Sequence, residues 1–308
     1  MIKIHEISKN FGQFSALKKL SIQVKKGEFY SLLGPNGAGK TTCINIATNM
    51  VKPNSGSIHI NGFDSLKQSQ EVKKQIGVIP QEIALYEDLS AVENLYFWGK
   101  INQVPANQLK SKINDTLHFL DLYEHRKKNI GTFSGGMKRR INIAAALLHD
   151  PEVLFMDEPT VGIDPQSRLF IYQIFQQLHE QGKTIFYTSH NMEEVELLSD
   201  RIGIIDHGEL IVEGRLDELK QRQNLEETLH LQFINPKQSK HAKKLLESKY
   251  KLIEKEQELF ISGQSVNKEL SSILQVFDRH EIEINSIEIQ KVNLEMIFLN
   301  LTGKTLRE

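Results

Sequence analysis

One short segment, residues 34–41, constrains this chain more than any other part of its sequence. It reads Gly-Pro-Asn-Gly-Ala-Gly-Lys-Thr and matches the pattern G-x-x-x-x-G-K-[ST] of phosphate-binding loops. An apolar segment, Phe29–Leu33, runs into the loop, and a helical pattern over residues 42–50 leaves it. In that order of strand, loop and helix, backbone N–H groups surround a phosphate chain. The segment therefore predicts a site for a phosphorylated ligand.

Individual residues of the loop suit separate tasks. Gly37 and Gly39 permit backbone angles and close approaches that a side chain would prevent. Lys40 is placed to reach the β- and γ-phosphates of a nucleoside triphosphate, and Thr41 offers a hydroxyl to Mg²⁺. The N-terminus of the following helix adds a partial positive charge. We therefore expect a nucleoside triphosphate with Mg²⁺ at this loop.

Length and composition narrow the class of protein. The 308 residues suffice for one large domain and a smaller one. The net charge of -1 gives no global argument for nucleic-acid binding, and we expect no nucleic-acid partner. The single cysteine, Cys43, precludes an internal disulfide and suits a reducing compartment. We find neither a signal peptide nor an apolar run of membrane-spanning length, so we expect a cytoplasmic protein that meets a membrane through a partner.

Strand and helix patterns alternate around the loop, which predicts an α/β fold with a doubly wound sheet. Three helical segments between the loop and residue 153 predict an inserted helical subdomain at about residues 82–150. The expected strands are residues 2–8, 21–24, 29–33, 57–60, 76–79, 153–156, 184–188, 202–205 and 210–212. The expected helices are residues 42–50, 92–101, 108–122, 136–148, 168–181 and 192–198.

The composition changes after about residue 221, which divides the chain into an expected nucleotide-binding domain of residues 1–221 and an accessory domain of residues 222–308. The second region predicts a small α+β domain, and no catalytic pattern stands out in it. Its expected elements are strands 228–233, 259–262 and 284–289 and helices 239–247, 268–280 and 294–301.

Two acids end the expected strand 153–156. A carboxylate at the C-terminal edge of a parallel strand lies beside the phosphate crevice of such a sheet. Asp157 is therefore placed to hold Mg²⁺ or its waters. Glu158, one residue further, is placed to polarise an attacking water.

Two more polar residues follow strands of the same sheet. His190 comes after the strand 184–188 and is placed to donate a hydrogen bond to a γ-phosphate. Gln81 comes after the strand 76–79 and is placed to contact Mg²⁺ or the attacking water. Phe11, in an expected loop after the first strand, is a candidate for stacking on adenine. The carboxyl edge of the sheet is therefore the predicted site of chemistry.

Ser134, Gly135 and Gly136 open the third helix of the expected helical subdomain. The serine suits an N-cap, and the two glycines leave backbone N–H groups open. An ordinary helix cap explains the segment equally well on its own. A second anion site makes sense if it covers the γ-phosphate of a nucleotide held by another copy, so that two chains head to tail enclose two ATP molecules.

Taken together, these segments resemble the ATP-binding subunits of ABC transporters over about residues 1–220. Residues 34–41 resemble the Walker A loop of that family, Gln81 its Q-loop, and residues 134–136 its signature motif. Asp157 and Glu158 resemble its Walker B acid and its catalytic glutamate. The resemblance implies a P-loop NTPase fold of the ABC ATPase type, with ATP and Mg²⁺ as cofactors.

The remaining family positions also have counterparts. Residues 162–164 resemble the D-loop, His190 the switch histidine of the H-loop, and Phe11 the adenine-stacking aromatic. The catalytic residues that the resemblance implies are Glu158, His190, Lys40 and Gln81. The implied metal ligands are Thr41, Gln81 and Asp157. The implied nucleotide contacts are Phe11, Gly34, Pro35, Asn36, Gly37, Ala38, Gly39, Lys40, Thr41, Thr42, Ser134, Gly135, Gly136 and Asp164.

The chain departs from the family pattern at three places. Phe133 and Met137 stand where the common signature has Leu and Gln, and Ile163 replaces a usual Leu of the D-loop. None of these changes removes a reacting group, so they bear on the contacts to a partner's nucleotide and not on hydrolysis. Residues 159–165 and 293–298 resemble the drug- and antibiotic-resistance exporter branch of ABC-2 type, which implies a separate membrane-spanning permease.

The resemblance implies an ATPase that drives export of a drug, antibiotic or lipid-like substrate. ATP closes two copies against each other, hydrolysis reopens the dimer, and the permease holds the protein at the inner face of the cell membrane. One alternative is a soluble ABC-type ATPase of translation or DNA repair, which the single phosphate loop and the short insertion disfavour. A second is a nucleotide switch without transport, which the presence of Glu158 and His190 disfavours.

Overall fold

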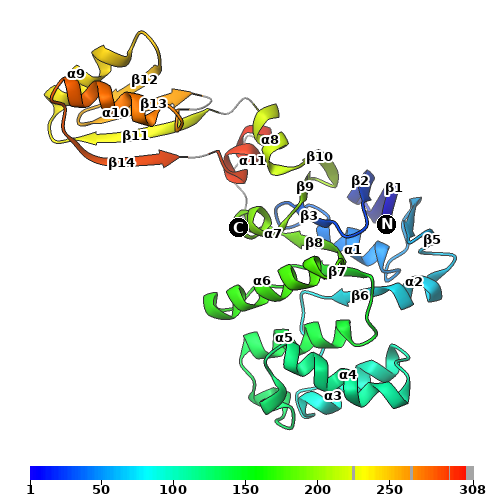
Figure 1. The fold of residues 1–308 in the computed structure, drawn as a ribbon. Coiled ribbons are helices and arrows are strands. Elements are labelled where there is room, and N and C mark those ends of the chain that lie inside the picture. The colour runs from blue at the N-terminus through cyan, green and yellow to red at the C-terminus, as the bar shows by residue number, and fades with distance from the viewer. Residues whose placement is uncertain (224–225, 264–265, 291, 303–308) are drawn as a thin grey trace. The chain divides into compact units, whose positions relative to one another are not determined.

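A computed structural model of the chain describes residues 1–223, 226–263, 266–290 and 292–302. The chain falls into two units, one of residues 1–216 and one that begins at Asp217 (Figure 1). The change of composition near residue 221 falls within helix α8 (Leu216–Arg222). Among the described residues, no helix combines the length and the apolar character that a bilayer crossing requires.

The first unit is built on a six-stranded sheet with the strand order β10-β9-β3-β8-β7-β6. Strands β9 to β6 run parallel to their neighbours, and β10 pairs antiparallel with β9. Strands β3, β7 and β8 are buried along their whole length, as in a sheet covered on both faces. The predicted α/β sheet is thereby confirmed. Its strands are β3 (Phe29–Leu33), β6 (Ile76–Ile79), β7 (Val153–Asp157), β8 (Thr184–Ser189), β9 (Arg201–Asp206) and β10 (Glu209–Gly214).

A separate antiparallel sheet of order β2-β1-β4-β5 contains β1 (Ile2–Phe11), β2 (Phe14–Val24), β4 (Ser55–Ile60) and β5 (Phe63–Asp64). The predicted place of Phe11 in a loop is wrong, because β1 continues to Phe11, which pairs with Phe14 across a tight hairpin. The pairing register of β1 and β2 shifts three times after Ile4. These bulges interrupt the alternation of apolar and polar residues by which a sequence reveals a strand.

Helix α1 (Lys40–Ala47) packs between these two sheets. Its Cys43 is fully buried in their shared core, and burial raises the pKa of the thiol to about 12. The helix begins at Lys40, two residues earlier than the pattern predicts. Because β3 delivers the loop to this helix, the start of α1 is fixed at the carboxyl edge of the six-stranded sheet.

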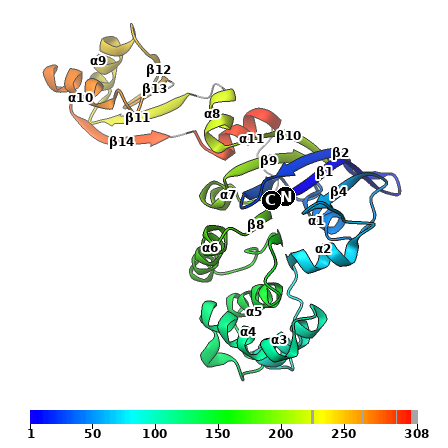
Figure 2. The same cartoon turned by 45° about the vertical axis from the view of Figure 1, so that its right-hand side comes forward.

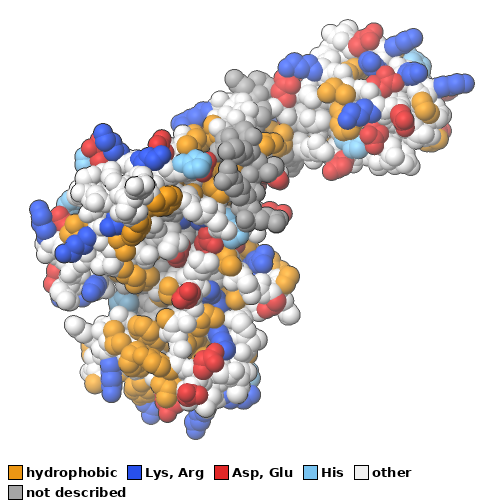
Figure 3. Space-filling model, turned by 180° about the vertical axis from the view of Figure 1, so that it is seen from behind, with side chains coloured by type: hydrophobic (Ala, Val, Ile, Leu, Met, Phe, Trp, Pro, Cys, Tyr) orange, Lys and Arg blue, Asp and Glu red, His pale blue; other side chains and the backbone are white. Residues whose placement is uncertain are grey.

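Helices cover the other face of the sheet. Three of them, α3 (Ala91–Ile101), α4 (Ala106–Phe119) and α5 (Gly135–Leu147), lie together at one end of this unit (Figures 1 and 2). Hydrophobic side chains gather on the surface of this end, in the lower part of Figure 3. The helix expected over residues 108–122 ends early, because Asp121 adopts a left-handed conformation (φ 54°) that closes it. Helices α2 (Ser69–Gln75), α6 (Pro165–Glu180) and α7 (Met192–Leu198) complete the unit.

The second unit carries a four-stranded antiparallel sheet of order β12-β13-β11-β14. Its core contains residues of helices α9 and α10 packed on the sheet. The sequence pattern misses β12, an edge strand whose Lys251, Ile253 and Lys255 are exposed. Its elements are β11 (Glu227–Phe233), α9 (Pro236–Leu246), β12 (Lys251–Lys255), β13 (Glu258–Gly263), α10 (Leu270–Arg279), β14 (Ile284–Gln290) and α11 (Leu294–Thr302).

Gly77 on β6 permits the close approach of helix α5. A Cβ atom added there would lie 2.6 Å from the carbonyl oxygen of Ala146 and 2.9 Å from Cγ of Pro151. The obstacle is partly backbone, so it cannot rotate away. We predict that Gly77→Ala lowers the free energy of unfolding by about 1–3 kcal/mol through overpacking.

Thermal unfolding followed by circular dichroism measures this loss. Gly135→Ala is the control, because a Cβ atom at Gly135 meets nothing within 4 Å, and Gly135 lies on α5, the helix against which Gly77 packs. An unfolding midpoint of Gly77→Ala equal to that of the control variant would contradict the packing argument.

Candidate active site

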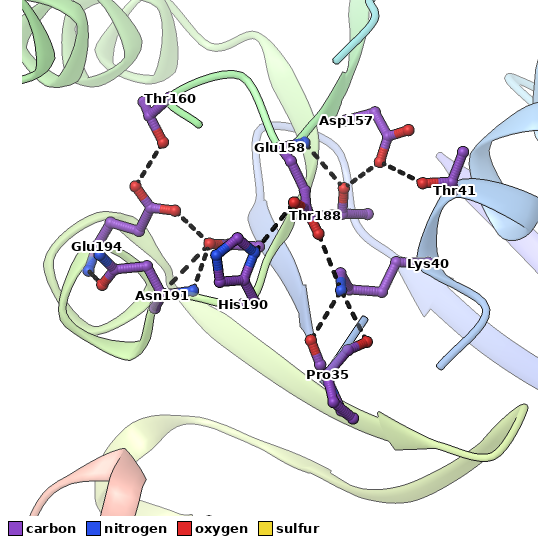
Figure 4. A network of polar contacts seen from close by, with 12 residues as sticks. Pro35, Lys40, Thr41, Asp157, Glu158, Thr160, Thr188, His190, Asn191 and Glu194 are labelled. Atoms are coloured by element: carbon purple, nitrogen blue, oxygen red, sulfur yellow. Dashed lines mark hydrogen bonds and ion pairs between the residues drawn. The ribbon is translucent and has the colours of Figure 1, made fainter. Parts of the chain in front are cut away.

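Lys40 lies at the centre of the polar network at the carboxyl edge of the sheet (Figure 4). Its side chain is buried, and Nζ donates to the carbonyl oxygens of Gly34 (2.8 Å) and Pro35 (3.0 Å). Nζ also lies 2.9 Å from Oε1 of Glu158, which is buried as well. The ammonium group is therefore held by its own loop and by a carboxylate from β7's end, in the place where the phosphates of a nucleotide are expected.

The shape of the loop requires glycine before Lys40. Gly39 has φ 109°, and a Cβ atom there would lie 2.6 Å from the carbonyl oxygen of Ala16. Gly37 has φ 80° with open space around it. Both conformations disfavour residues with a side chain, and the open space at Gly37 leaves its backbone accessible to a ligand.

Asp157, the last residue of β7, lies beside Thr41. Its Oδ1 accepts hydrogen bonds from Oγ1 of Thr41 (3.2 Å) and from Oγ1 of Thr188 (2.7 Å). Burial raises the pKa of Asp157, although these two hydrogen bonds act in the opposite direction. The Asp157 carboxylate and the Thr41 hydroxyl lie together, and Thr41 lines one cavity with Gln81. The three side chains offer hard oxygen donors, which fit Mg²⁺. A cation at this position would stabilise the ionised form of Asp157.

Glu158 follows directly, and its carboxylate faces the side chains of Lys40 and His190. Oε1 contacts Lys40, and Oε2 lies 3.0 Å from Nδ1 of His190. The backbone of Glu158 is left-handed (φ 43°), and its N–H donates to the carbonyl oxygen of Thr188 (3.1 Å). This conformation is uncommon for a residue other than glycine, and the hydrogen bond to β8 holds it in place. His190 thus meets the expected acid at hydrogen-bonding distance, one residue after the end of β8.

A cavity of about 270 Å³ opens beside these groups. It brings together most of the predicted residues of the loop with Gln81 and Glu158. Its lining consists of Phe14, Ala16, Asn36, Gly37, Gly39, Lys40, Thr41, Thr42, Gln81 and Glu158. The predicted adenine contact Phe11 is not in this set, and its ring instead lies 5.0 Å from Nζ of Lys9.

Sequence reasoning missed Phe14, the aromatic residue that lines the cavity. Both rings are exposed, Phe11 by 50% and Phe14 by 61%, on opposite strands of one hairpin. An alternative choice of aromatic was visible in the sequence three residues after Phe11, but the pairing of β1 with β2 was not. Stacking of adenine on Phe11 remains a prediction.

Arg139 on α5 is a second residue that sequence reasoning missed. Its buried guanidinium donates to the carbonyl oxygens of Pro80 (2.6 Å) and Gln81 (2.5 Å). Burial lowers the pKa of Arg139. The helix that begins after Ser134 is therefore fastened to the backbone of the predicted Q-loop residue. In the sequence Arg139 stands between Lys138 and Arg140, so nothing there distinguished it from a solvated basic run.

The predicted signature residues lie away from the cavity. Ser134 caps α5 by accepting a hydrogen bond from the N–H of Met137 (3.2 Å), and Asp164 caps α6 by accepting one from Ser167 (2.9 Å). Gly136 brings the two helix starts together, because a Cβ atom there would lie 2.2 Å from Oγ of Ser167. Neither Ser134 nor Asp164 lines the cavity around Lys40.

One chain therefore presents two separate polar surfaces. The first surrounds Lys40, and the second carries Ser134, Gly135 and the start of α6. Ser134 and Gly135 are exposed, and their backbone is open to a second molecule. Contact of a nucleotide with the residues predicted to bind it remains a prediction, both for those that line the cavity and for Gly34, Pro35, Ala38, Ser134, Gly135, Gly136 and Asp164, which do not.

The chain is similar in sequence to known proteins. A family model described as "ABC transporter" matches residues 17–161. The chain is 45% identical over 311 aligned positions to the linearmycin resistance ATP-binding protein LnrL of Bacillus subtilis, with 100% of both chains covered. It is 32% identical to the daunorubicin resistance ATP-binding protein DrrA3 of Streptomyces coeruleorubidus, over 98% of this chain and 96% of the relative.

Solved structures agree with the fold. An ATP-binding subunit of an ABC transporter superposes with a TM-score of 0.66 at 25% identity, over 72% of this chain and 92% of that one. A dimeric ATP-binding cassette in a post-hydrolysis state, bound to ADP and Pi, superposes with a TM-score of 0.63 at 27% identity, over 70% of this chain and 98% of that one. On the full-length identity with LnrL and on these cassettes, the chain belongs to the ABC transporter family, as an ATP-binding subunit that hydrolyses ATP.

Proposed function

We propose that this chain powers the export of a drug- or antibiotic-like molecule through a separate membrane permease, with two copies closing on two ATP molecules. Two relatives that align with it over nearly the whole of both chains are named for resistance to linearmycin and daunorubicin, which supports a substrate of this class. A transport role is favoured over translation or DNA repair by the same full-length matches.

The observation that carries the proposal is the separation of the two polar surfaces. Lys40, Glu158 and His190 form one side of a nucleotide site, and Ser134 with Gly135 forms an open helix start elsewhere on the chain. One molecule does not bring them together around the cavity. Head-to-tail association of two copies supplies the missing side of each site, and a relative cassette is dimeric.

Binding of ATP changes the partners of Lys40 in this mechanism. The triphosphate offers Lys40 oxygen atoms that replace the carboxylate of Glu158. Glu158 is then free to orient the attacking water and accept its proton, while His190 donates to the γ-phosphate. Lys40 and His190 stabilise the charge that develops on the transferred group.

The residues that would hold Mg²⁺ are Thr41, Asp157 and Gln81. When bound, the ion neutralises charge on the β- and γ-phosphate oxygens. Thr188 keeps the Asp157 carboxylate oriented toward Thr41 through its 2.7 Å hydrogen bond. The protein's own contribution is a carboxylate that is already positioned before the ion arrives.

A groove of about 460 Å³ between the sheet and the helical end of the first unit is the proposed seat of the permease. Met50 (66% exposed) and Ile101 line it together with Trp98, whose Nε1 donates to the carbonyl oxygen of Ala84 (3.2 Å). A concave surface that combines these apolar residues with Lys73 and Lys74 fits a short amphipathic helix. The groove also borders Pro80, so a helix seated there lies next to the Gln81 segment that Arg139 holds.

Replacing the proposed base tests the mechanism. Glu158→Gln removes the group that accepts the proton of the water, so we predict a fall in kcat of about 10²-fold or more with ATP binding retained. Phosphate release and binding of a fluorescent ATP analogue measure the two effects. Glu152→Gln, an exposed acid at the opposite end of β7, is the control. Turnover near that of the control would exclude Glu158 as the base.

Blocking the second surface tests the two-copy site. Ser134→Arg places a long cation at the open start of α5, so we predict that ATP no longer closes the dimer while the monomer keeps its ATP affinity. Light scattering of the ATP-saturated protein in the Glu158→Gln background measures closure. Gln108→Arg adds the same side chain at an exposed position of α4 and should leave the dimer intact. Loss of ATP affinity in monomeric Ser134→Arg would contradict a site shared between copies.

A charge in the groove tests the permease seat. Met50→Glu places a carboxylate on the apolar lining, so we predict at least a tenfold loss of binding to permease-containing membranes, about 1.4 kcal/mol. Co-sedimentation with membranes that contain the permease measures it. Leu197→Glu on α7 is the control, an exposed apolar residue outside the groove lining. Equal sedimentation of both variants would place the permease elsewhere.

A further inference from the structure

Glu194 on α7 is a buried acid that the mechanism above does not use. Its side chain is 3% exposed, and in the described part of the chain its carboxylate accepts hydrogen bonds from hydroxyl groups. Oε2 accepts hydrogen bonds from Oγ1 of Thr160 (2.7 Å) and from Oη of Tyr172 (2.7 Å). Oε1 accepts one from Oγ of Ser189. A carboxylate is an acceptor only, so it orients all three hydroxyl groups as donors.

The three hydroxyl groups come from three different parts of the fold. Ser189 ends β8 and directly precedes His190. Thr160 lies two residues after Glu158, in the turns that lead to Asp164 and α6. Tyr172 lies within α6. Figure 4 shows Glu194 between Thr160 on one side and the His190 segment on the other. One carboxylate thus bridges the histidine side and the Asp164 side, with one oxygen directed at each.

The favourable interaction of an acid with the dipole of helix α7 does not explain why Glu194 is buried. Glu193 occupies the same first turn of α7 and is exposed, so it supplies the same negative charge in water. Burying a carboxylate is costly unless hydrogen bonds satisfy it, and three hydroxyl groups meet that need here. Charge-assisted hydrogen bonds are about twice as strong as neutral ones, so moving either end of this bridge is resisted.

We propose that Glu194 is a positioning residue that couples the position of the His190 side chain to the position of the segment from Thr160 to Asp164. The coupling rests on the proposed function, in which Asp164 faces the second copy and His190 faces the chain's own nucleotide. A shift of His190 from Glu158 toward a phosphate displaces Ser189, and Glu194 passes this displacement to Thr160. The state of one nucleotide site is thereby transmitted to the other site of the dimer.

The test is Glu194→Gln in the full chain, with Glu193→Gln as the matched control on the same turn. The amide keeps the shape of the side chain but replaces one accepting oxygen with a donor, so one arm of the bridge is lost. We expect kcat to fall by about 10-fold to 10²-fold through misplacement of His190, with ATP affinity retained. The Hill coefficient for ATP, at most about 2 for two sites, should fall to about 1.

Two single-arm variants separate coupling from a structural role. Thr160→Val cuts the arm toward Asp164, so it should lower the Hill coefficient with little change of kcat. Ser189→Ala cuts the arm toward His190 and should lower both. These two variants also test the coupling through Glu194 if Glu194→Gln fails to fold. Unchanged Hill coefficients in both, or a loss of thermal stability alone, would overturn the proposal.

Failure of the coupling is distinguishable from failure of the proposed function. Light scattering of ATP-saturated Glu158→Gln reports whether two copies close at all. A closed dimer together with wild-type Hill coefficients in both Thr160→Val and Ser189→Ala refutes the coupling alone. Absence of the dimer refutes the two-copy site itself, and with it the basis on which Glu194 would act.

Discussion

The buried contact between Lys40 and Glu158 is the interaction on which the rest of the site depends. Removing an ammonium and a carboxylate from water costs several kcal/mol for each ion, so neither group is stable at this place alone. Lys40 is compensated by Glu158 and by two carbonyl oxygens of its own loop. A triphosphate supplies the same compensation. The arrival of ATP and the release of Glu158 are therefore linked by charge.

Parallel strands bring these groups together. The carboxyl ends of β3, β7 and β8 meet at one edge of the sheet. Each strand passes directly into a functional segment, which places Lys40, Glu158 and His190 within hydrogen-bonding distance of a common point. The strands are buried on both faces, so their ends are held rigidly. The positions of the predicted catalytic groups thus follow from the packing of three apolar segments far apart in the sequence.

The position of the site at strand ends explains which residues could be predicted from the sequence. Residues at the ends of continuous apolar strands, such as Asp157 and His190, were predictable because strand, turn and polar residue are adjacent in the chain. Phe14 and the edge strand β12 were not, because bulges or an exposed edge remove the alternation that reveals a strand. Arg139 and Glu194 were missed for a different reason: their partners lie more than 20 residues away in the sequence or on other elements, and only folding brings them together.

Those two missed residues share one physical design. Arg139 is a buried cation that donates hydrogen bonds to carbonyl oxygens, and Glu194 is a buried anion that accepts hydrogen bonds from hydroxyl groups. Held by neutral dipoles, Arg139 on α5 keeps strong directional bonds to the segment of Pro80 and Gln81, and Glu194 keeps them to separate segments of the fold. The elements that such a residue joins must shift together, because a shift of one alone would leave a buried charge unsatisfied, which is costly. Arg139 thus links the signature helix to Gln81, as Glu194 links His190 to the Asp164 segment, and both couplings are built from polar groups inside the protein.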